Sequence, residues 1–468
     1  MATTSSKLVQ QLDAVNEYER EPIPPGKRKG LGSFIGMYAG EHTAGTEFVI
    51  GPLFVAHGVS APDLVWGLLI GNLLAVLSWA LICAPIAVRT RVTLYFQLEK
   101  ICGSTLVKGY NLVNGVMFCF LAGSMIAVSA TAVGIPFDIA MPGLGDLYPN
   151  SLGWVLTVLA VGAVVTLIAI RGYEQVSRFA NLAAPWMPLV FIASALAVLP
   201  ELGVHSWRDF WPQAEAEIWT GVVQEGQSKF TFWHVMFFAW FANMAMHIGL
   251  ADMSVLRYAR KWQYGFSSAT GMYVGHFIAW LASGILYAVW LQKFGNAEFA
   301  PGKIAYYAAG LAGAACVVIA GWTTANPTIY RAGLAFQALN PRWKTWKVTL
   351  VTGLVTTLAA CFPALVMKLL DFVALYGLLL MPMGAVIVMD LYVLPRLGMQ
   401  DEYARRTQSR FNVAAAVTWL GTLLVCLLLN FTQGIEIFFL GLPGWFIAAL
   451  LYVGISKWQQ RNLRAPAV

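Results

Sequence analysis

The sequence predicts an all-α, polytopic membrane protein with twelve transmembrane helices, and three observations lead to this prediction. Of the 468 residues, 58% are hydrophobic and only 11% are charged, whereas a soluble domain carries about 25% charged residues. Twelve apolar stretches are long enough to cross a hydrocarbon core of about 30 Å, which takes about 20 helical residues. The basic residues gather on alternate connections between these stretches, as the positive-inside rule requires.

The twelve predicted spans follow one another with short, polar connections that are too short to fold as separate domains. In chain order they cover residues 31–56, 63–88, 105–134, 152–170, 182–200, 230–251, 268–291, 304–336, 347–367, 371–394, 411–431 and 435–456. The longest connection, 201–229, contains Trp207, Trp211 and Trp219. We expect this segment to lie in the membrane interface, where tryptophan is enriched.

The distribution of charge predicts the orientation. With the N-terminus in the cytoplasm, 25 of the 30 lysines and arginines fall on the two tails, on the even-numbered loops or in the span ends next to these loops. The remaining five, Arg208, Lys229, Lys293, Lys303 and Lys368, fall on the other side. We therefore expect a multi-pass protein of the inner (plasma) membrane with both termini cytoplasmic. The net charge of +7 follows from this topology and does not indicate nucleic acid, and the polar first thirty residues predict no signal peptide.

The first predicted span is interrupted by polar residues. It contains the run Gly40-Glu41-His42-Thr43-Ala44-Gly45-Thr46-Glu47, followed by Gly51-Pro52. A carboxylate near the membrane centre costs roughly 3 kcal/mol on insertion scales. Glu41, His42 and Glu47 are therefore expected to face a cavity where the helix unwinds. The alternative is that one or both of the carboxylates lie nearer an interface, hydrated and structural.

The sixth predicted span has a matching irregularity, running from Trp240 and Phe241 through Asn243 to His247 and Gly249. Asn243 and His247 are four residues apart, which places them on one face of a continuous helix. A histidine on such a face is more often a hydrogen-bonded core residue than a functional one. Breaks in the first and sixth helices are typical of two inverted five-helix repeats followed by two peripheral helices.

The expected organisation has four parts. Residues 1–30 form a cytoplasmic tail and 31–200 the first five-helix repeat. Residues 201–395 form the periplasmic connection and the second repeat, and 396–468 form the two peripheral helices and the second tail. Six scattered cysteines show no CxxC spacing and are interpreted as small core residues.

The eighth predicted span offers oxygen ligands. Pro327 cannot donate a backbone hydrogen bond, which frees a carbonyl at Thr323 one turn earlier. Thr323 and Thr324 add two adjacent hydroxyls, and hard oxygens of this kind suit an alkali cation. The alternative is that the threonines bond only their own helix backbone.

These residues resemble the nucleobase:cation symporter-1 family, especially its cytosine permeases. The resemblance spans roughly residues 30–410 and is carried by Gly321-Trp322-Thr323-Thr324, Leu69-Ile70-Gly71-Asn72-Leu73-Leu74 and the run from Pro382 to Asp390, with Arg257-Tyr258-Ala259-Arg260 also fitting. It implies a leucine-transporter-like fold with sodium between helices 1 and 8. The implied ion ligands are the carbonyls of Glu41, Ala44 and Ala320 with Thr323 and Thr324.

In this family a flat heterocycle stacks between aromatic residues of helices 3 and 6. The positions that the resemblance assigns to substrate binding in this chain are Gly45, Phe118, Ala122, Trp240, Phe241, Asn243 and Asn326. The register on helix 6 is open among Trp240, Phe241 and Asn243. Ala122 stands where family members often have a glutamine, and Glu41, His42 and Glu47 are unusual, which implies a different hydrogen-bonding edge on the substrate.

Two transport hypotheses follow. The first is sodium-coupled import of a nucleobase, a hydantoin-like ring or a related planar nitrogenous solute. The second is proton-coupled transport of a cationic or amine-bearing solute, with Glu41 or Glu47 as counter-ion and His42 or His247 titrating.

An enzyme is disfavoured because no HExxH, clustered histidines or Gly-x-Ser-x-Gly occurs, and broken helices favour alternating access over a channel. The expected partners are a small solute and the bilayer, with no cofactor beyond the coupling ion. The oligomeric state is open, and a monomer is compatible with it.

Overall fold

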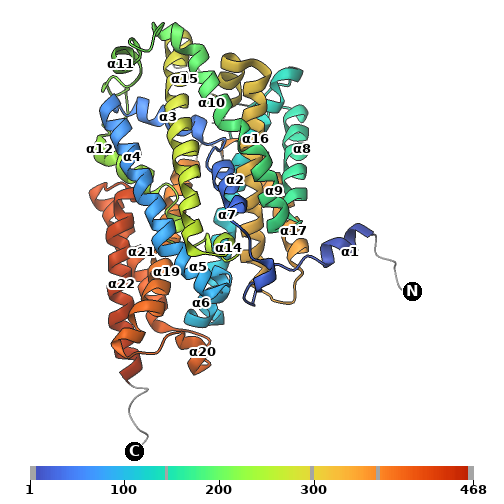
Figure 1. Cartoon of the computed structure of the whole chain (residues 1–468), viewed down its shortest axis with the longest axis vertical. Coiled ribbons are helices and arrows are strands. Elements are labelled where there is room, and N and C mark those ends of the chain that lie inside the picture. The colour runs from blue at the N-terminus through green and yellow to red at the C-terminus, as the bar shows by residue number, and fades with distance from the viewer. Residues whose placement is uncertain (1–6, 143–145, 296–299, 365–368, 462–468) are drawn as a thin grey trace, which may run out of the picture.

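Apolar helices form the body of the chain in the computed structural model, which describes residues 7–142, 146–295, 300–364 and 369–461 (Figure 1). Among these residues, nine helices are long and apolar enough to cross a membrane. Helices suit this environment because every interior backbone group is hydrogen-bonded within its own segment. The prediction of an all-α multi-pass membrane protein is confirmed.

The first half of the chain begins with a short helix and continues into the first bundle of spans. Its helices are α1 (Lys7–Asp13), α2 (Gly32–Glu41), α3 (Glu47–Ala56), α4 (Ala61–Ser78), α5 (Ala84–Thr90), α6 (Leu94–Cys102), α7 (Ser104–Val133), α8 (Leu152–Ala169), α9 (Tyr173–Ala183) and α10 (Trp186–Val198). One π-helical turn, Trp79–Cys83, joins α4 to α5 without interrupting the span.

The second half continues the bundle and ends with two outer helices. Its helices are α11 (Phe210–Gln213), α12 (Phe232–Phe241), α13 (Met244–His247), α14 (Met253–Leu256), α15 (Ile278–Phe294), α16 (Pro301–Gln337), α17 (Thr345–Ala360), α19 (Leu369–Val388), α20 (Tyr403–Thr407), α21 (Val413–Gln433) and α22 (Ile437–Arg461). A π-helical segment, Thr270–Phe277, leads directly into α15.

Helix interruptions occur in the first and sixth spans, where the sequence predicts them. The first span is divided into α2 and α3 by residues 42–46, and the sixth into α12 and α13 around Ala242 and Asn243. In α16 the non-helical backbone lies at Ala309 and Gly310 (φ +56°), whereas no such distortion occurs at Pro327. Each of the twelve predicted ranges contains helix, and the range 347–367 ends outside the described residues. The count of twelve spans stays a prediction.

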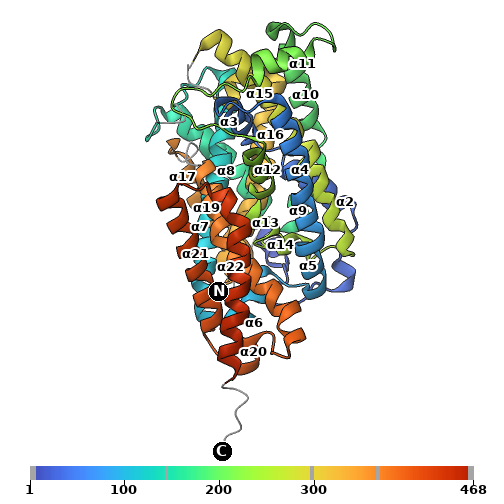
Figure 2. The same cartoon turned by 90° about the vertical axis from the view of Figure 1, so that its left-hand side faces the viewer.

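Long-range packing brings the broken helices into the centre of the bundle. The helix pairs α7 with α16, α3 with α15 and α4 with α12 pack along one another. The last two helices, α21 and α22, pack on each other and on α19, at the side of the bundle (Figures 1 and 2). They occupy the peripheral position that the sequence predicts for them.

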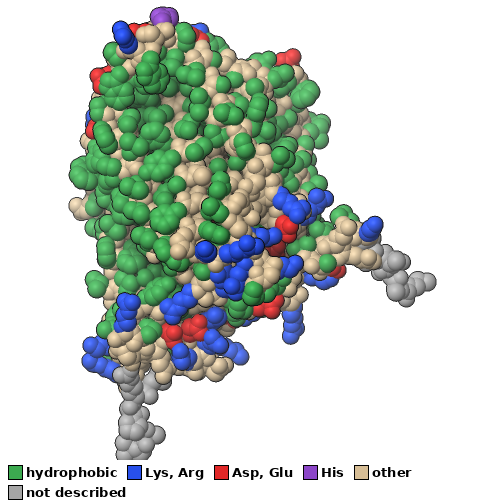
Figure 3. All heavy atoms as spheres, viewed as in Figure 1, with side chains coloured by type: hydrophobic (Ala, Val, Ile, Leu, Met, Phe, Trp, Pro, Cys, Tyr) green, Lys and Arg blue, Asp and Glu red, His purple; other side chains and the backbone are tan. Residues whose placement is uncertain are grey.

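The surface separates apolar from basic side chains. Figure 3 shows hydrophobic side chains covering most of one face, with Lys and Arg gathered in its lower part. We call this lower end, where α6, α20 and the C-terminal end of α22 lie, the basic end. The connection with α11 lies at the opposite end, where Trp207 is 83% exposed while Trp219 is buried. Five of the six cysteines are buried and Cys119 is half-buried.

Candidate functional site

A cavity of about 90 Å³ lies beside the two helix breaks. This volume is several times what one water molecule needs. Its lining comes from both halves of the chain: Glu41, His42, Ala44, Thr46, Glu47, Ile50, Leu121, Phe238, Phe241, Ala242, Asn243, Met244, Ala245, Met246, His276, Trp280, Thr324, Val373, Ala374, Tyr376 and Phe438. Residues of both breaks therefore face one space.

Oxygen atoms converge where the break after α2 meets α16. The hydroxyl of Thr324 lies 3.0 Å from the carbonyl oxygen of Glu41 and 3.2 Å from that of Ala320. The hydroxyl of Thr323 lies 3.0 Å from the same Ala320 carbonyl. Four of the five predicted ion ligands are therefore within reach of one another. The fifth, the carbonyl of Ala44, accepts a hydrogen bond from the backbone of Glu47 at 3.1 Å.

A small residue allows this close approach. A β-carbon on Gly45 would lie 2.8 Å from the Val128 side chain of α7 and 3.7 Å from Gly321 of α16. Gly45 therefore packs the unwound segment against α7 and α16. Gly45 is not among the residues that line the cavity. Its role in substrate binding stays a prediction.

A buried cluster of charges lies next to these oxygens. Arg331 of α16 pairs with the carboxylate of Glu41 through both terminal nitrogens, one of them at 3.0 Å, and with Asp252 at 2.7 Å. Trp79 and Tyr38 donate hydrogen bonds of 2.6 Å and 3.1 Å to Asp252. With both carboxylates ionised, one guanidinium faces two negative charges. Burying such a cluster is tolerated only when its groups are paired and hydrogen-bonded.

Glu47 has different partners from Glu41. Its carboxylate accepts a hydrogen bond from Trp280 and lies 3.8 Å from Nε2 of His276. The rings of His276 and Trp280 stack at 4.4 Å, and His42 meets His276 edge-on at 5.1 Å. Asn243 lies 3.5 Å from the same Nε2 of His276. The wall of the cavity on this side is therefore both polar and aromatic.

Asn243 lies at the break in the sixth span and directly precedes α13, which ends at His247. Asn243 lines the cavity, whereas His247 stacks on Trp79 at 4.6 Å and contacts the carbonyl of Trp240 at 3.0 Å. The expectation that both side chains share one helical face is wrong, because the backbone is not helical at Asn243 (φ −110°, ψ 29°). The proposed titration of His247 remains a prediction.

The aromatic residues predicted for substrate stacking lie in three different settings. Phe241 lines the cavity, and Trp240 stacks on it at 4.6 Å while donating a hydrogen bond to Ser78. Phe118 is buried against Tyr376, with ring centres 5.1 Å apart, and Tyr376 lines the cavity in its place.

Two further predicted substrate positions are buried without lining the cavity. Ala122 is fully buried on α7, where Leu121 is the residue that reaches the cavity. The Asn326 amide is also fully buried, and neither of its polar atoms has a hydrogen-bond partner in the described part of the chain.

The sequence interpretation missed His276, Trp280 and Tyr376. A histidine inside the apolar range 268–291 was a usable signal, because ionisable residues inside membrane spans are costly and usually functional. Trp280 follows His276 by four residues on the same segment. No comparable signal distinguishes Tyr376 from other aromatic residues of its span.

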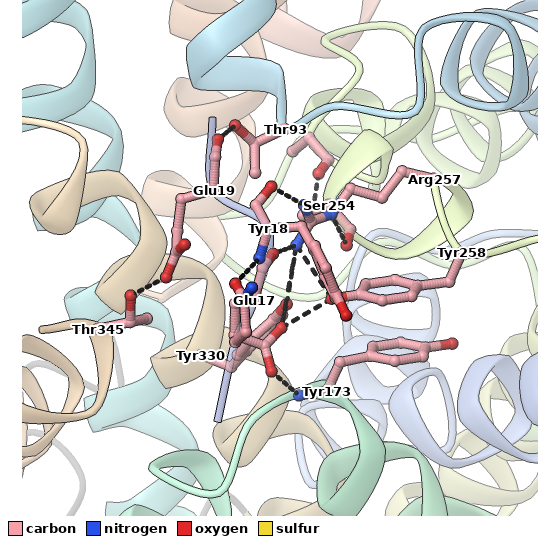
Figure 4. A network of polar contacts seen from close by, with 12 residues as sticks. Glu17, Tyr18, Glu19, Thr93, Tyr173, Ser254, Arg257, Tyr258, Tyr330 and Thr345 are labelled. Carbon is pink, nitrogen blue, oxygen red and sulfur yellow. Dashed lines mark hydrogen bonds and ion pairs between the residues drawn. The ribbon is translucent and has the colours of Figure 1, made fainter. Parts of the chain in front are cut away.

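A second buried network surrounds Glu17 (Figure 4). Glu17 of the N-terminal segment accepts hydrogen bonds from Tyr258 (2.9 Å), Tyr330 (2.6 Å) and the backbone of Tyr173 (3.1 Å). Arg257 lies 3.9 Å from its carboxylate and donates to the carbonyls of Glu17 and Tyr18. Because Tyr330 and Arg331 are adjacent on α16, this network lies directly next to the charge cluster around Arg331.

Solved transporters share this fold over nearly the whole chain. A nucleobase-cation-symport-1 family transporter, Mhp1, in a closed conformation with bromovinylhydantoin bound, matches with a TM-score of 0.74 and 14% identity, covering 96% of each chain. The inward-facing conformation of Mhp1 matches with a TM-score of 0.69 and 12% identity, covering 95% of each chain. A substrate-bound, outward-open Na⁺-coupled sialic acid symporter matches with a TM-score of 0.69 and 14% identity, covering 96% of this chain and 93% of that one. The predicted leucine-transporter-like fold is confirmed.

No family model matches the chain, and no curated protein sequence matches it.

Proposed function

We propose that the protein is a secondary active transporter that imports a small planar nitrogenous solute, such as a nucleobase or a hydantoin-like ring, together with sodium. The observation that carries this proposal is the convergence of the Glu41 and Ala320 carbonyls with the hydroxyls of Thr323 and Thr324. Carbonyls at a helix break, such as that of Glu41 at the end of α2, coordinate sodium in broken-helix transporters. The resemblance in fold to Na⁺-coupled and nucleobase-cation symporters supports the same function.

Electrostatics favour a cation at this position. With both carboxylates ionised, the buried cluster of Arg331, Glu41 and Asp252 has one positive and two negative groups. A sodium ion held by the backbone carbonyl of Glu41 lies close to that excess negative charge and compensates it. In a low-dielectric interior such compensation is strong, because charges interact more strongly there than in water.

The cavity wall suits a flat solute with hydrogen-bonding edges. Phe241 and Trp280 offer aromatic faces, and Asn243 and His276 offer polar groups. An aromatic pair contributes about 0.5–1.5 kcal/mol beyond area burial. Sodium that orders the break after α2 raises the affinity for such a solute, and by linkage the solute raises the affinity for sodium equally.

The arrangement at the basic end fits a closed state of an alternating-access cycle. The network around Glu17 joins the N-terminal segment to α9 and α16. The chain also matches closed Mhp1 with a higher TM-score than inward-facing Mhp1, 0.74 against 0.69. Release of the solute toward this end therefore requires the Glu17 network to open.

The test begins with ligand screening of the purified chain. Nucleobases, hydantoins and amines are added in sodium or in potassium, and the melting temperature is measured; a ligand that binds the folded state raises it by mass action. We expect a planar heterocycle to raise it in sodium and not in potassium. Uptake of that compound into proteoliposomes should then follow a sodium gradient. Sodium-independent binding of every compound would contradict the proposal.

Proton-coupled transport of a cationic or amine-bearing solute is the second candidate, favoured by the contacts between Glu47, His276 and Trp280. It predicts uptake driven by a pH gradient and a flat pH profile in Glu47→Gln. The exposed Glu436→Gln is the matched control. Sodium coupling instead predicts that Glu47→Gln keeps its dependence on sodium.

A further inference from the structure

A second and larger cavity opens on the outer side of the bundle, away from the solute site. It is a groove of about 950 Å³ between α7, α17 and the segment that joins α16 to α17. None of the residues that line it lines the solute cavity. Its walls are apolar, with Val116 and Phe120 on α7 and Val351 and Val355 on α17.

Positive charges stand at one end of this groove. Arg342, Lys344 and Lys347 all line it at the basic end, together with Trp343, which is 49% exposed. Lys344 pairs with Asp13 at 2.6 Å, whereas no acidic group in the described chain lies within ion-pair distance of Arg342 or Lys347. Glu19 reaches the neighbouring Thr345, but neither Asp13 nor Glu19 lines the groove.

The length of the groove matches one leaflet of a bilayer. Along α17 it runs from Lys347 to Ala359, which is about 18 Å at about 1.5 Å per residue. Half of a hydrocarbon core of about 30 Å is about 15 Å. Val351 and Val355 are 59% and 58% exposed, so the apolar part of the groove is open from the side. An occupant therefore needs a negative head at the basic end and an apolar tail one leaflet long.

We propose that this groove binds an anionic phospholipid, with its phosphate at Arg342 and Lys347 and an acyl chain between α7 and α17. Basic pockets between transmembrane helices on the cytoplasmic side are suited to acidic headgroups. A second copy of this chain fits the groove less well, because a two-fold interface would bring the basic ends of two identical grooves together. The proposal is independent of the transported solute.

The experiment compares lipid-dependent thermal stability of the full-length protein in detergent. The probes are phosphatidylglycerol, phosphatidylcholine with the same acyl chains, and inorganic phosphate. The variants are Arg342→Gln/Lys347→Gln and Val355→Trp, which fills the groove. The control is Lys457→Gln/Arg461→Gln, which removes two exposed charges on α22.

We expect phosphatidylglycerol to raise the melting temperature of the wild type and the control, with little effect of phosphatidylcholine or phosphate. The apparent affinity for phosphatidylglycerol should fall about thirtyfold in Arg342→Gln/Lys347→Gln, since two basic residues near a lipid headgroup are removed. Equal stabilisation by both lipids, stabilisation by phosphate alone, unchanged affinity in that double variant, or dimerisation through this face would overturn the proposal. If Val355→Trp does not fold, the affinity of Arg342→Gln/Lys347→Gln for phosphatidylglycerol still tests the proposal, because both residues are exposed.

Discussion

At the scale of single residues, Glu41 and Glu47 show how position within a break determines the role of a carboxylate. Glu41 ends α2 and is held by Arg331, while Glu47 begins α3 and faces His276 and Trp280. Glu41 thus presents its carbonyl to the proposed ion and its side chain to a fixed cation. Glu47 is the carboxylate next to His276 and Trp280, which line the cavity proposed for the solute.

The hydroxyl of Thr324 gives a sharp test of the ion site. Thr324→Ala removes the group that reaches the carbonyl of Glu41, whereas the Thr323 hydroxyl bonds its own helix and Met187 among the described residues. A hydrogen bond or ligand contact to a charged group contributes about 1.5–3 kcal/mol. We therefore expect Thr324→Ala to raise the sodium concentration for half-maximal uptake about tenfold or more, and more than Thr323→Ala does.

The matched control for this prediction is Thr328→Ala, one turn further along α16. The Thr328 hydroxyl bonds the carbonyl of Thr324 within the helix and lies outside the cavity lining. Sodium activation should be close to wild type in this variant. If Thr324→Ala and Thr328→Ala show the same sodium dependence, the threonine pair is not the ion site.

At the scale of elements, the sequence predicted the helices and their breaks better than the orientation of side chains inside them. Spans follow from composition, because a hydrocarbon environment demands long apolar segments. The breaks in the first and sixth spans follow from polar residues where lipid would exclude them. The residues available to stack on a solute could not be predicted from the sequence, because the backbone at Asn243 is not helical and the Trp240 side chain donates a hydrogen bond to Ser78.

The N-terminal segment is an element whose attachment depends on pH. Burial raises the pKa of Glu17, and Arg257 and the tyrosine hydroxyls offset only part of that rise. When the segment detaches, the pKa returns toward its ordinary value of 4.5. The attached form therefore binds a proton more tightly, so attachment strengthens as the pH falls through the raised pKa toward 4.5, and weakens as the pH rises.

Hydrogen exchange of residues 15–20, expressed relative to the unfolded chain at each pH, measures this attachment. We expect greater protection at pH 5 than at pH 8 in the wild type. Glu17→Gln cannot titrate and should show no such difference. Glu21→Gln, which changes a nearby exposed carboxylate, should keep the wild-type trend. The same pH trend in Glu17→Gln would show that another group controls the segment.

At the scale of the whole molecule, the two ends differ in charge. The basic end carries α6, α20 and the C-terminal end of α22, and the connection with α11 lies at the other end. The positive-inside rule then predicts that the basic end is cytoplasmic. This orientation places the Glu17 network and the mouth of the lipid groove on the cytoplasmic side, facing the leaflet that is rich in anionic lipid.

Cysteine labelling in intact cells tests the orientation and the number of spans together. Arg208→Cys lies in the connection before α11 and Arg405→Cys lies on α20, and both arginines are exposed. Five predicted spans separate them, so they should be on opposite sides of the membrane. We expect a membrane-impermeant maleimide to label Arg208→Cys in intact cells and Arg405→Cys only after permeabilisation. Because five native cysteines are buried and Cys119 is half-buried, the wild type should give a low background. The reverse labelling would invert the orientation, and labelling of both from one side would show that the number of spans between them is even.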